Sequence, residues 1–209
     1  MTRQMGEAKF REEQRSLLNA PHIAPITAYV ESLSSQERWL PHVAPMHGGV
    51  NARMLVVLRD PGPATNVDTG SGMLSLENND QTAATQVRLM GLAGIKPNDL
   101  VPWNAYPWYI NRQPTAAELR GATNALLGLV DLLPLLTVVL LQGEQARVAW
   151  TLTLEARPAL RFKRIIAIET YHPSVQALRS SDPNERDRRR QHRVTAWGVA
   201  GDILRGAAA

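Results

Sequence analysis

Four short apolar runs divide the chain, and each has the length of a buried strand. They cover residues 54–58, 100–103, 136–141 and 164–168. Their apolar residues are mostly continuous rather than alternating with polar ones, which is typical of strands covered on both faces in a parallel sheet. The pattern therefore predicts four strands, mainly parallel.

Segments with helical character lie before and between these runs. Residues 7–18 and 25–34 predict two helices ahead of the first strand. Asp80 can accept hydrogen bonds from the first turn of a helix over residues 81–92. A further helix is expected from about Glu144.

Two other helices carry start signals of their own. Thr115 and Glu118 have the spacing of a capping box, which predicts a helix that runs to about Leu133. Pro183 suits the first position of the last helix, and Glu185 is placed for a second capping box.

Helices that alternate with strands predict an α/β fold, with a short parallel sheet and helices on both faces. A chain of 209 residues suits one domain. We expect that domain to span residues 1–209, with a core at about 50–206 and the N-terminal helices within 7–35.

Composition narrows the function classes. The chain has no cysteine, so disulfides, thiolate metal sites and cysteine nucleophiles are excluded. The N-terminus is charged and lacks an apolar signal segment, and the apolar stretch 126–141 is interrupted by Gly128, Asp131 and Pro134. We expect a soluble, cytoplasmic protein with no membrane contact.

Positive charge is concentrated late in the chain. The net charge is +4, and residues 157–193 hold ten Lys or Arg against four Asp or Glu. Such a stretch attracts polyanions such as nucleic acid, although a solvated helix face is the more common explanation of charge alone.

Polar residues stand at the ends of three predicted strands. Asp60, Asn104 and His172 should meet at one edge of the sheet, where sites form in parallel α/β folds. A carboxylate can activate water, an amide can read a base edge, and an imidazole can donate to a developing anion. Each residue alone could equally belong to a turn, but the combination is more specific.

The motifs around these residues resemble those of the uracil-DNA glycosylase superfamily. Residues 58–63 read Leu-Arg-Asp-Pro-Gly-Pro, residues 100–105 hold an Asn at the end of a strand, and residues 172–174 read His-Pro-Ser. The resemblance covers about residues 53–178. It implies a three-layer sandwich, a base-excision activity and neither metal nor organic cofactor.

The resemblance also implies roles for the matching residues. Asp60 would activate the water that attacks the sugar C1′, Asn104 would read the edge of a flipped uracil, and His172 would stabilise charge on its O2. The partner would be single- or double-stranded DNA, bound by a monomer.

Residues after His172 would contact that DNA. Ser174 and Arg179 are the expected backbone contacts. Gln176 matches the position of the side chain that replaces the flipped base, whereas Leu178 is chemically the better wedge, and the sequence leaves this choice open.

Three positions depart from the family pattern. Arg59 lies in a motif that usually opens with Gly. Met73 is expected where an aromatic side chain would stack on the base, and Gly62 replaces a Tyr that excludes the methyl group of thymine. The missing aromatic and the altered motif start, Leu58 and Arg59, keep an alternative open: a nucleic-acid-binding protein on the same fold, with weak or no hydrolysis. A hydrolase of small nucleosides is disfavoured by the basic region.

Two other groups are interpreted as structural. His42 and His47 have no nearby acidic residue that would favour a metal site. The aromatic residues beside Asn104 are expected to pack beneath the adjoining loop rather than stack on nucleic acid; they are Trp103, Tyr106, Trp108 and Tyr109.

Overall fold

A four-stranded parallel sheet forms the centre of the computed structural model, which describes residues 3–206. Its strands are β2 (Met54–Leu58), β4 (Leu100–Asn104), β5 (Val138–Gln142) and β6 (Ile166–Thr170), in the order β4-β2-β5-β6. All three pairings are parallel. The predicted α/β fold is therefore confirmed.

The boundaries of the last two strands differ from the prediction. β5 begins at Val138 because the backbone of Leu136 still belongs to a turn, in which its N–H donates to Leu133. β6 begins at Ile166, which pairs with Val138, and therefore runs on to Thr170. This shift puts His172 only two residues beyond the strand.

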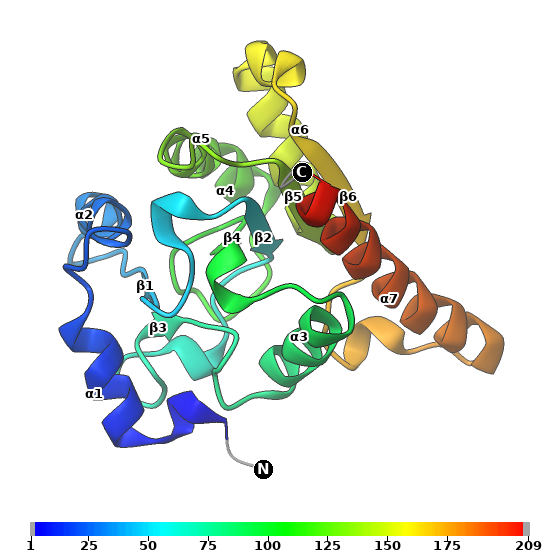
Figure 1. Ribbon diagram of the computed structural model, residues 1–209, viewed down its shortest axis with the longest axis horizontal. Helices are drawn as coiled ribbons and strands as arrows, with labels where there is room; N and C mark the ends of the chain where they lie inside the picture. Colours follow the sequence, from blue (N-terminus) through cyan, green and yellow to red (C-terminus); the bar gives the residue numbers. More distant parts are fainter. Residues whose placement is uncertain (1–2, 207–209) are drawn as a thin grey trace.

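Helices cover both faces of the sheet and give three layers (Figure 1). One face packs against α2 (Ala24–Leu33), α4 (Ala116–Gly121), α5 (Thr123–Asp131) and α6 (Glu144–Ala156). The other packs against α3 (Gln81–Leu92) and α7 (Pro183–Gly206). Alternate residues of each strand supply the two cores: Val57 and Leu141 face the first, whereas Val56 and Leu140 face the second.

Most of the predicted helix starts are present. The Asp80 side chain accepts from the backbone N–H groups of Thr82 and Ala83. Thr115 and Glu118 form the expected capping box. The helix predicted to run to Leu133 is, however, interrupted at Ala122, so that it forms α4 and α5.

Pro183 is the first residue of α7, as predicted. The capping box predicted for Glu185 is wrong, because this side chain accepts instead from two arginines in the next turn, Arg188 and Arg189. The N-terminal turn is closed by Asp182, whose carboxylate accepts from the backbone N–H of Asn184.

The N-terminal third forms a smaller unit against the sheet. After α1 (Ala8–Ser16) and α2, the short strand β1 (His42–Val43) pairs in parallel with β3 (Met73–Leu74). Short 3₁₀ helices complete the fold: η1 (Gln4–Gly6), η2 (Gly49–Asn51), η3 (Pro63–Thr65), η4 (Pro97–Asp99), η5 (Pro158–Phe162) and η6 (Gln176–Leu178). Within residues 3–206, every helix is too short or too polar to cross a bilayer.

Candidate active site

One large cleft lies at the carboxyl ends of the sheet strands. Its volume is about 1170 Å³. Asn104 pairs in register with Leu58, and Gln142 pairs with Thr170, so these strands end at one edge of the sheet. The lining includes six of the predicted site residues: Asp60, Gly62, Asn104, His172, Ser174 and Gln176.

Asp60 supplies a shielded carboxylate two residues beyond β2. Its side chain is 3% exposed, and one carboxylate oxygen accepts from Nε of Arg59. Burial raises the pKa of Asp60, whereas the hydrogen bond and charge of Arg59 and the charge of Arg112 lower it. The carboxylate is thus held in a place where few water molecules can reach it.

Asn104 supplies an amide with an unused donor. It is the last residue of β4 and is 2% exposed, and its Nδ2 has no hydrogen-bond partner among residues 3–206. Parallel pairing continues beyond the strand, because Ala105 N–H donates to the Leu58 carbonyl at 2.8 Å. A buried amide donor without a partner is costly, so a ligand that accepts from Nδ2 would be favoured.

His172 supplies a neutral imidazole. The Ser174 N–H donates to its Nδ1 at 3.2 Å, so the neutral ring carries its proton on Nε2. Burial, with the charges of Arg59 and Arg193, lowers the pKa of His172 to about 4. At neutral pH the ring is therefore an uncharged hydrogen-bond donor through Nε2.

Gly143 allows the turn after β5 to approach this histidine. Its φ is +101°, a conformation that side chains rarely adopt, and an added Cβ would lie 3.3 Å from the Cβ of His172. The turn at Gly143 therefore packs directly against the side chain of His172.

A pair of buried amides, Gln86 and Gln142, was missed by sequence reasoning. Nε2 of Gln142 donates to Oε1 of Gln86 at 2.6 Å, and Gln86 lines the cleft. Gln142 is the last residue of β5, so the strand-end rule that selected Asn104 could also have found it. Gln86 lies inside α3, where the sequence gives no comparable signal.

Arg193 was also missed. It lies on α7, is 4% exposed, and its guanidinium donates to the backbone carbonyls of His172 and Ser174. The only signal was its place in the basic region 157–193, for which a solvated helix face is the more common explanation.

The prediction that Met73 lies beside the base is wrong. Met73 is 2% exposed and packs with Met5 and Ala44 in a separate cluster under the N-terminal segment. Met73 is therefore outside the lining of the cleft, which includes the neighbouring Leu74 and Leu76 instead.

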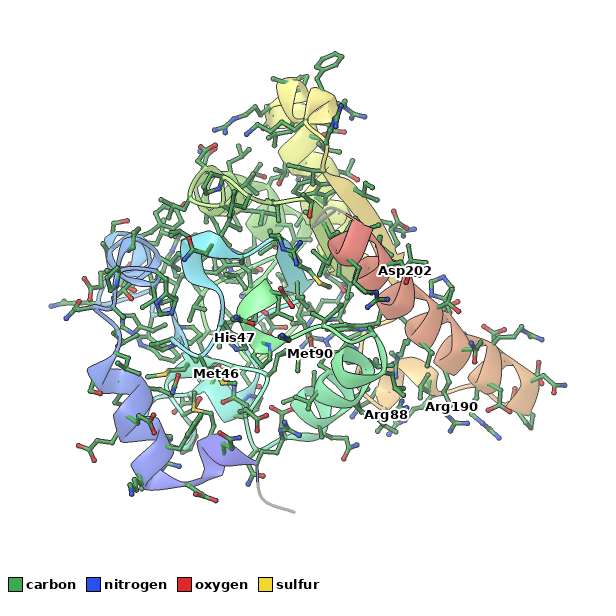
Figure 2. All side chains as sticks on the ribbon, viewed as in Figure 1. Met46, His47, Arg88, Met90, Arg190 and Asp202 are labelled. Atoms are coloured by element: carbon green, nitrogen blue, oxygen red, sulfur yellow. The ribbon has the colours of Figure 1, made fainter. Side chains whose placement is uncertain are left out.

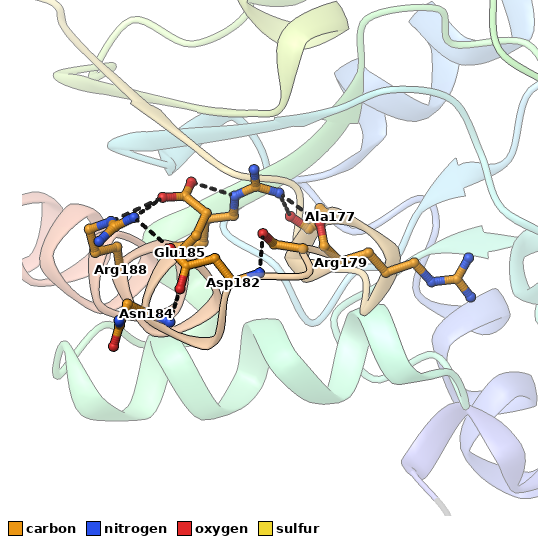
Figure 3. Close-up of polar contacts among 8 residues, drawn as sticks. Ala177, Arg179, Asp182, Asn184, Glu185 and Arg188 are labelled. Carbon is orange, nitrogen blue, oxygen red and sulfur yellow. Dashed lines mark hydrogen bonds and ion pairs between the residues drawn. The ribbon is translucent and has the colours of Figure 1, made fainter.

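The two wedge candidates occupy different places. Gln176 is exposed and lines the cleft, whereas Leu178 is half-buried and lies outside the lining. Arg179 is also outside the lining, and its side chain extends away from the turn (Figure 3). Of the two, Gln176 is therefore the one whose position adjoins the cleft.

Gly62 leaves an opening in the cleft. It lines the cleft, it is exposed, and an added Cβ would meet no atom within 4 Å. A larger side chain at this position would have room to reach into the cleft.

The residues interpreted as structural have structural contacts. His47 is 1% exposed inside the body of the protein (Figure 2), where it contacts the Pro97 carbonyl and accepts from the Leu76 N–H. Trp103, Tyr106 and Trp108 are buried, which confirms packing, although Trp103 also lines the cleft. Within the described part of the chain, no three His, Asp or Glu residues are grouped to hold a metal.

The chain matches no protein-family model and no curated protein. Its function must therefore be argued from the geometry of the cleft.

Proposed function

We propose that this protein is a DNA N-glycosylase that releases uracil, or a related deaminated or mismatched base, in base-excision repair. One observation carries the proposal: a buried carboxylate, a buried amide with a free donor and a neutral imidazole donor line the same cleft. These groups come from Asp60, Asn104 and His172.

The chemistry assigned to these groups is hydrolysis of the bond between the base and C1′. Asp60 orients a water molecule and takes up its proton as the oxygen bonds to C1′. The electron pair of the broken bond leaves with the base, and His172 Nε2–H donates to the O2 that gains negative charge. The base anion then takes up the proton that Asp60 releases to solvent, so the products are the neutral free base and an abasic sugar, and Asp60 is again a carboxylate.

Asn104 is proposed to select the base. The edge of uracil presents an N3–H donor and an O4 acceptor, which the oxygen and nitrogen of one amide can satisfy together. The free Nδ2 of Asn104 fits the O4 half of this pairing. The base must leave the helical stack to reach the cleft, which favours bases that are mismatched or damaged.

A second candidate is a nucleic-acid-binding protein with weak or no hydrolysis. Two observations favour it. The Asp60 carboxylate is already engaged by Arg59, and aliphatic Leu74 and Leu76 stand where an aromatic partner for the base would be useful. In either case we propose a cytoplasmic monomer that acts on DNA.

Base release from an oligonucleotide panel distinguishes the two candidates. The panel contains single and double strands with uracil, hypoxanthine, xanthine or mismatched thymine. We expect release from at least one substrate, and a loss of about 10²–10⁴-fold in Asp60→Asn, with DNA binding retained. Asp68→Asn is the control, since Asp68 is exposed and outside the cleft lining. Binding without release by the wild type would support the second candidate.

A further inference from the structure

Three arginines on one face of α7 donate to the loop that carries His172. Arg186, Arg189 and Arg193 are spaced by three and four residues, which places them on neighbouring turns of the helix. Together they donate to backbone carbonyls between residues 172 and 180. We call these three residues the arginine row.

Arg193 holds the first part of the loop. One guanidinium nitrogen donates to the carbonyls of His172 and Ser174, the latter at 2.9 Å. No carboxylate pairs with Arg193 among residues 3–206. Burial and the charges of Arg190 and Arg88 lower the pKa of Arg193 to about 10, so it stays charged at neutral pH.

Arg189 and Arg186 hold the second part. Nη1 of Arg189 donates to the carbonyls of Ala177 and Arg179, each at 3.2 Å, while its Nε donates to Glu185 at 2.9 Å (Figure 3). Its guanidinium also lies 5.4 Å from the ring centroid of Tyr171. Arg186 donates to the Ser180 carbonyl at 2.8 Å.

These arginines supply hydrogen-bond donors to the backbone carbonyls of the loop. In a regular helix or strand, backbone N–H groups would supply them. A carbonyl that is removed from water and lacks a partner destabilises the conformation that buries it. The loop conformation therefore depends on the arginine row. Because His172 Nδ1 accepts from Ser174 N–H inside this segment, the tautomer of the imidazole depends on it too.

We infer that the arginine row positions the two parts of the loop for different steps. Arg193 orients His172 for the departure of the base, and Arg189 orders residues 176–179 against DNA. Both are positioning residues, because they donate to the backbone of this chain and not to the substrate. The two assigned steps rest on the proposed function, whereas the dependence of the His172 tautomer on Arg193 does not.

The arrangement also assigns Arg189 and Arg193 a different use from phosphate binding. Arg193 is buried, and Arg189 has its guanidinium directed at the loop. Arg190, one residue beyond Arg189, points outward with 57% of its side chain exposed and pairs with Asp187 (Figure 2). Arg190 thus provides a matched control on the same helix.

The kinetic test compares Arg193→Met, Arg189→Met and Arg190→Met on a substrate that the full-length protein cleaves. Arg193→Met should lower kcat on the order of 100-fold with little change in KM, because a small displacement of His172 affects the chemical step. Arg189→Met should raise KM and the Kd for DNA roughly tenfold, with kcat nearly unchanged. Arg190→Met should match the wild type. Equal effects of Arg193→Met and Arg189→Met on both kcat and KM would overturn the inference that the two arginines serve different steps.

A second measurement needs no base release. The ¹⁵N NMR signals of the His172 imidazole should show the Nε2–H tautomer in the wild type and a mixture of tautomers in Arg193→Met. Arg193→Lys keeps the charge and a donor, so it should recover the wild-type tautomer in part; it also replaces Arg193→Met if that variant does not fold. Wild-type imidazole signals in a folded Arg193→Met protein would overturn the inference, whereas failure of the glycosylase proposal alone would leave these signals as expected.

Discussion

The two sides of the cleft are held in place by different means. On the side of Asp60 and Asn104, the backbone ladder between β2 and β4 continues past the strands, because Tyr106 N–H donates to the Arg59 carbonyl at 3.0 Å. On the side of His172, backbone carbonyls instead accept from arginine side chains of α7. The first side is fixed by neighbouring strands, and the second by a helix that follows later in the chain.

Burial has opposite effects on the pKa values of the titratable groups on the two sides. Burial raises the pKa of Asp60 and lowers the pKa of His172. Both shifts reflect the same desolvation, which disfavours whichever form is charged. Burial in the cleft therefore favours the neutral form of the imidazole and opposes ionisation of the carboxyl group, which the charge of Arg59 in turn supports.

The largest expected effect is the pH dependence of stability. The pKa values of His172 and His47 are both lowered to about 4. The unfolded chain takes up these protons near pH 6.5, so the free energy of unfolding should fall as the pH drops from about 6.5 to about 4. For the fully buried His47 the fall is about 3 kcal/mol, and for His172 no more than that.

Urea unfolding between pH 4 and 7 measures this effect. His47→Gln and His172→Gln should each remove part of the fall. Asp60 acts in the opposite direction, because its raised pKa favours the folded state as the pH drops through that pKa, so Asp60→Asn should steepen the fall. A wild-type profile that is flat from pH 6.5 to 4 would contradict the assignment of neutral, shielded imidazoles.

The next effect concerns Asn104, on the side held by the strand ladder. Asn104→Asp replaces the free amide donor with an acceptor, which opposes the O4 of uracil and suits the amino group of cytosine. A buried mismatch of this kind costs about 1–3 kcal/mol. We expect uracil release to fall by roughly 5- to 150-fold, or preference to move toward cytosine. Equal uracil release by variant and wild type would remove Asn104 from base selection.

Gly62 tests whether that side of the cleft is open. No atom lies within 4 Å of an added Cβ, so Gly62→Tyr should fit and project an aromatic ring into the cleft. A clash with a methyl group at C5 should lower release of thymine relative to uracil by roughly tenfold or more. The measurement is relative release of uracil and 5-substituted uracils. If the wild type already rejects every C5 substituent as strongly, the opening has no role in selection.

The smallest effect is expected for Arg179, on the side held by α7. Its carbonyl is engaged by Arg189, but its side chain extends outward (Figure 3). Arg179→Ala should flatten the slope of log affinity against log salt by about 0.9 for duplex DNA, the loss of one phosphate contact. Arg157→Ala is the control, because Arg157 pairs with Asp131. An unaltered slope would place Arg179 off the DNA.

The sequence was informative where local rules decide the structure. Continuous apolar runs marked the strands, and polar residues after them marked Asp60, Asn104 and His172. It misplaced Met73, because two-residue strands such as β1 and β3 are too short to give a periodic signal. It also missed Gln86 and Arg193, whose partners lie 56 and 21 residues away in the chain. Contacts of that range are set by packing of whole elements, which a local pattern does not encode.

Gly201 allows α7 to pack closely against the end of α3. This glycine lies where α7 crosses the end of α3, and an added Cβ would collide with the carbonyl of Ala93. It is eight residues beyond Arg193, about 12 Å along the helix. Any side chain at Gly201 would push α7 away from α3, and the arginine row that holds the loop of His172 would move with it. A complete substitution scan should therefore find an intolerant position at Gly201, although this residue has no side chain and lies outside the cleft.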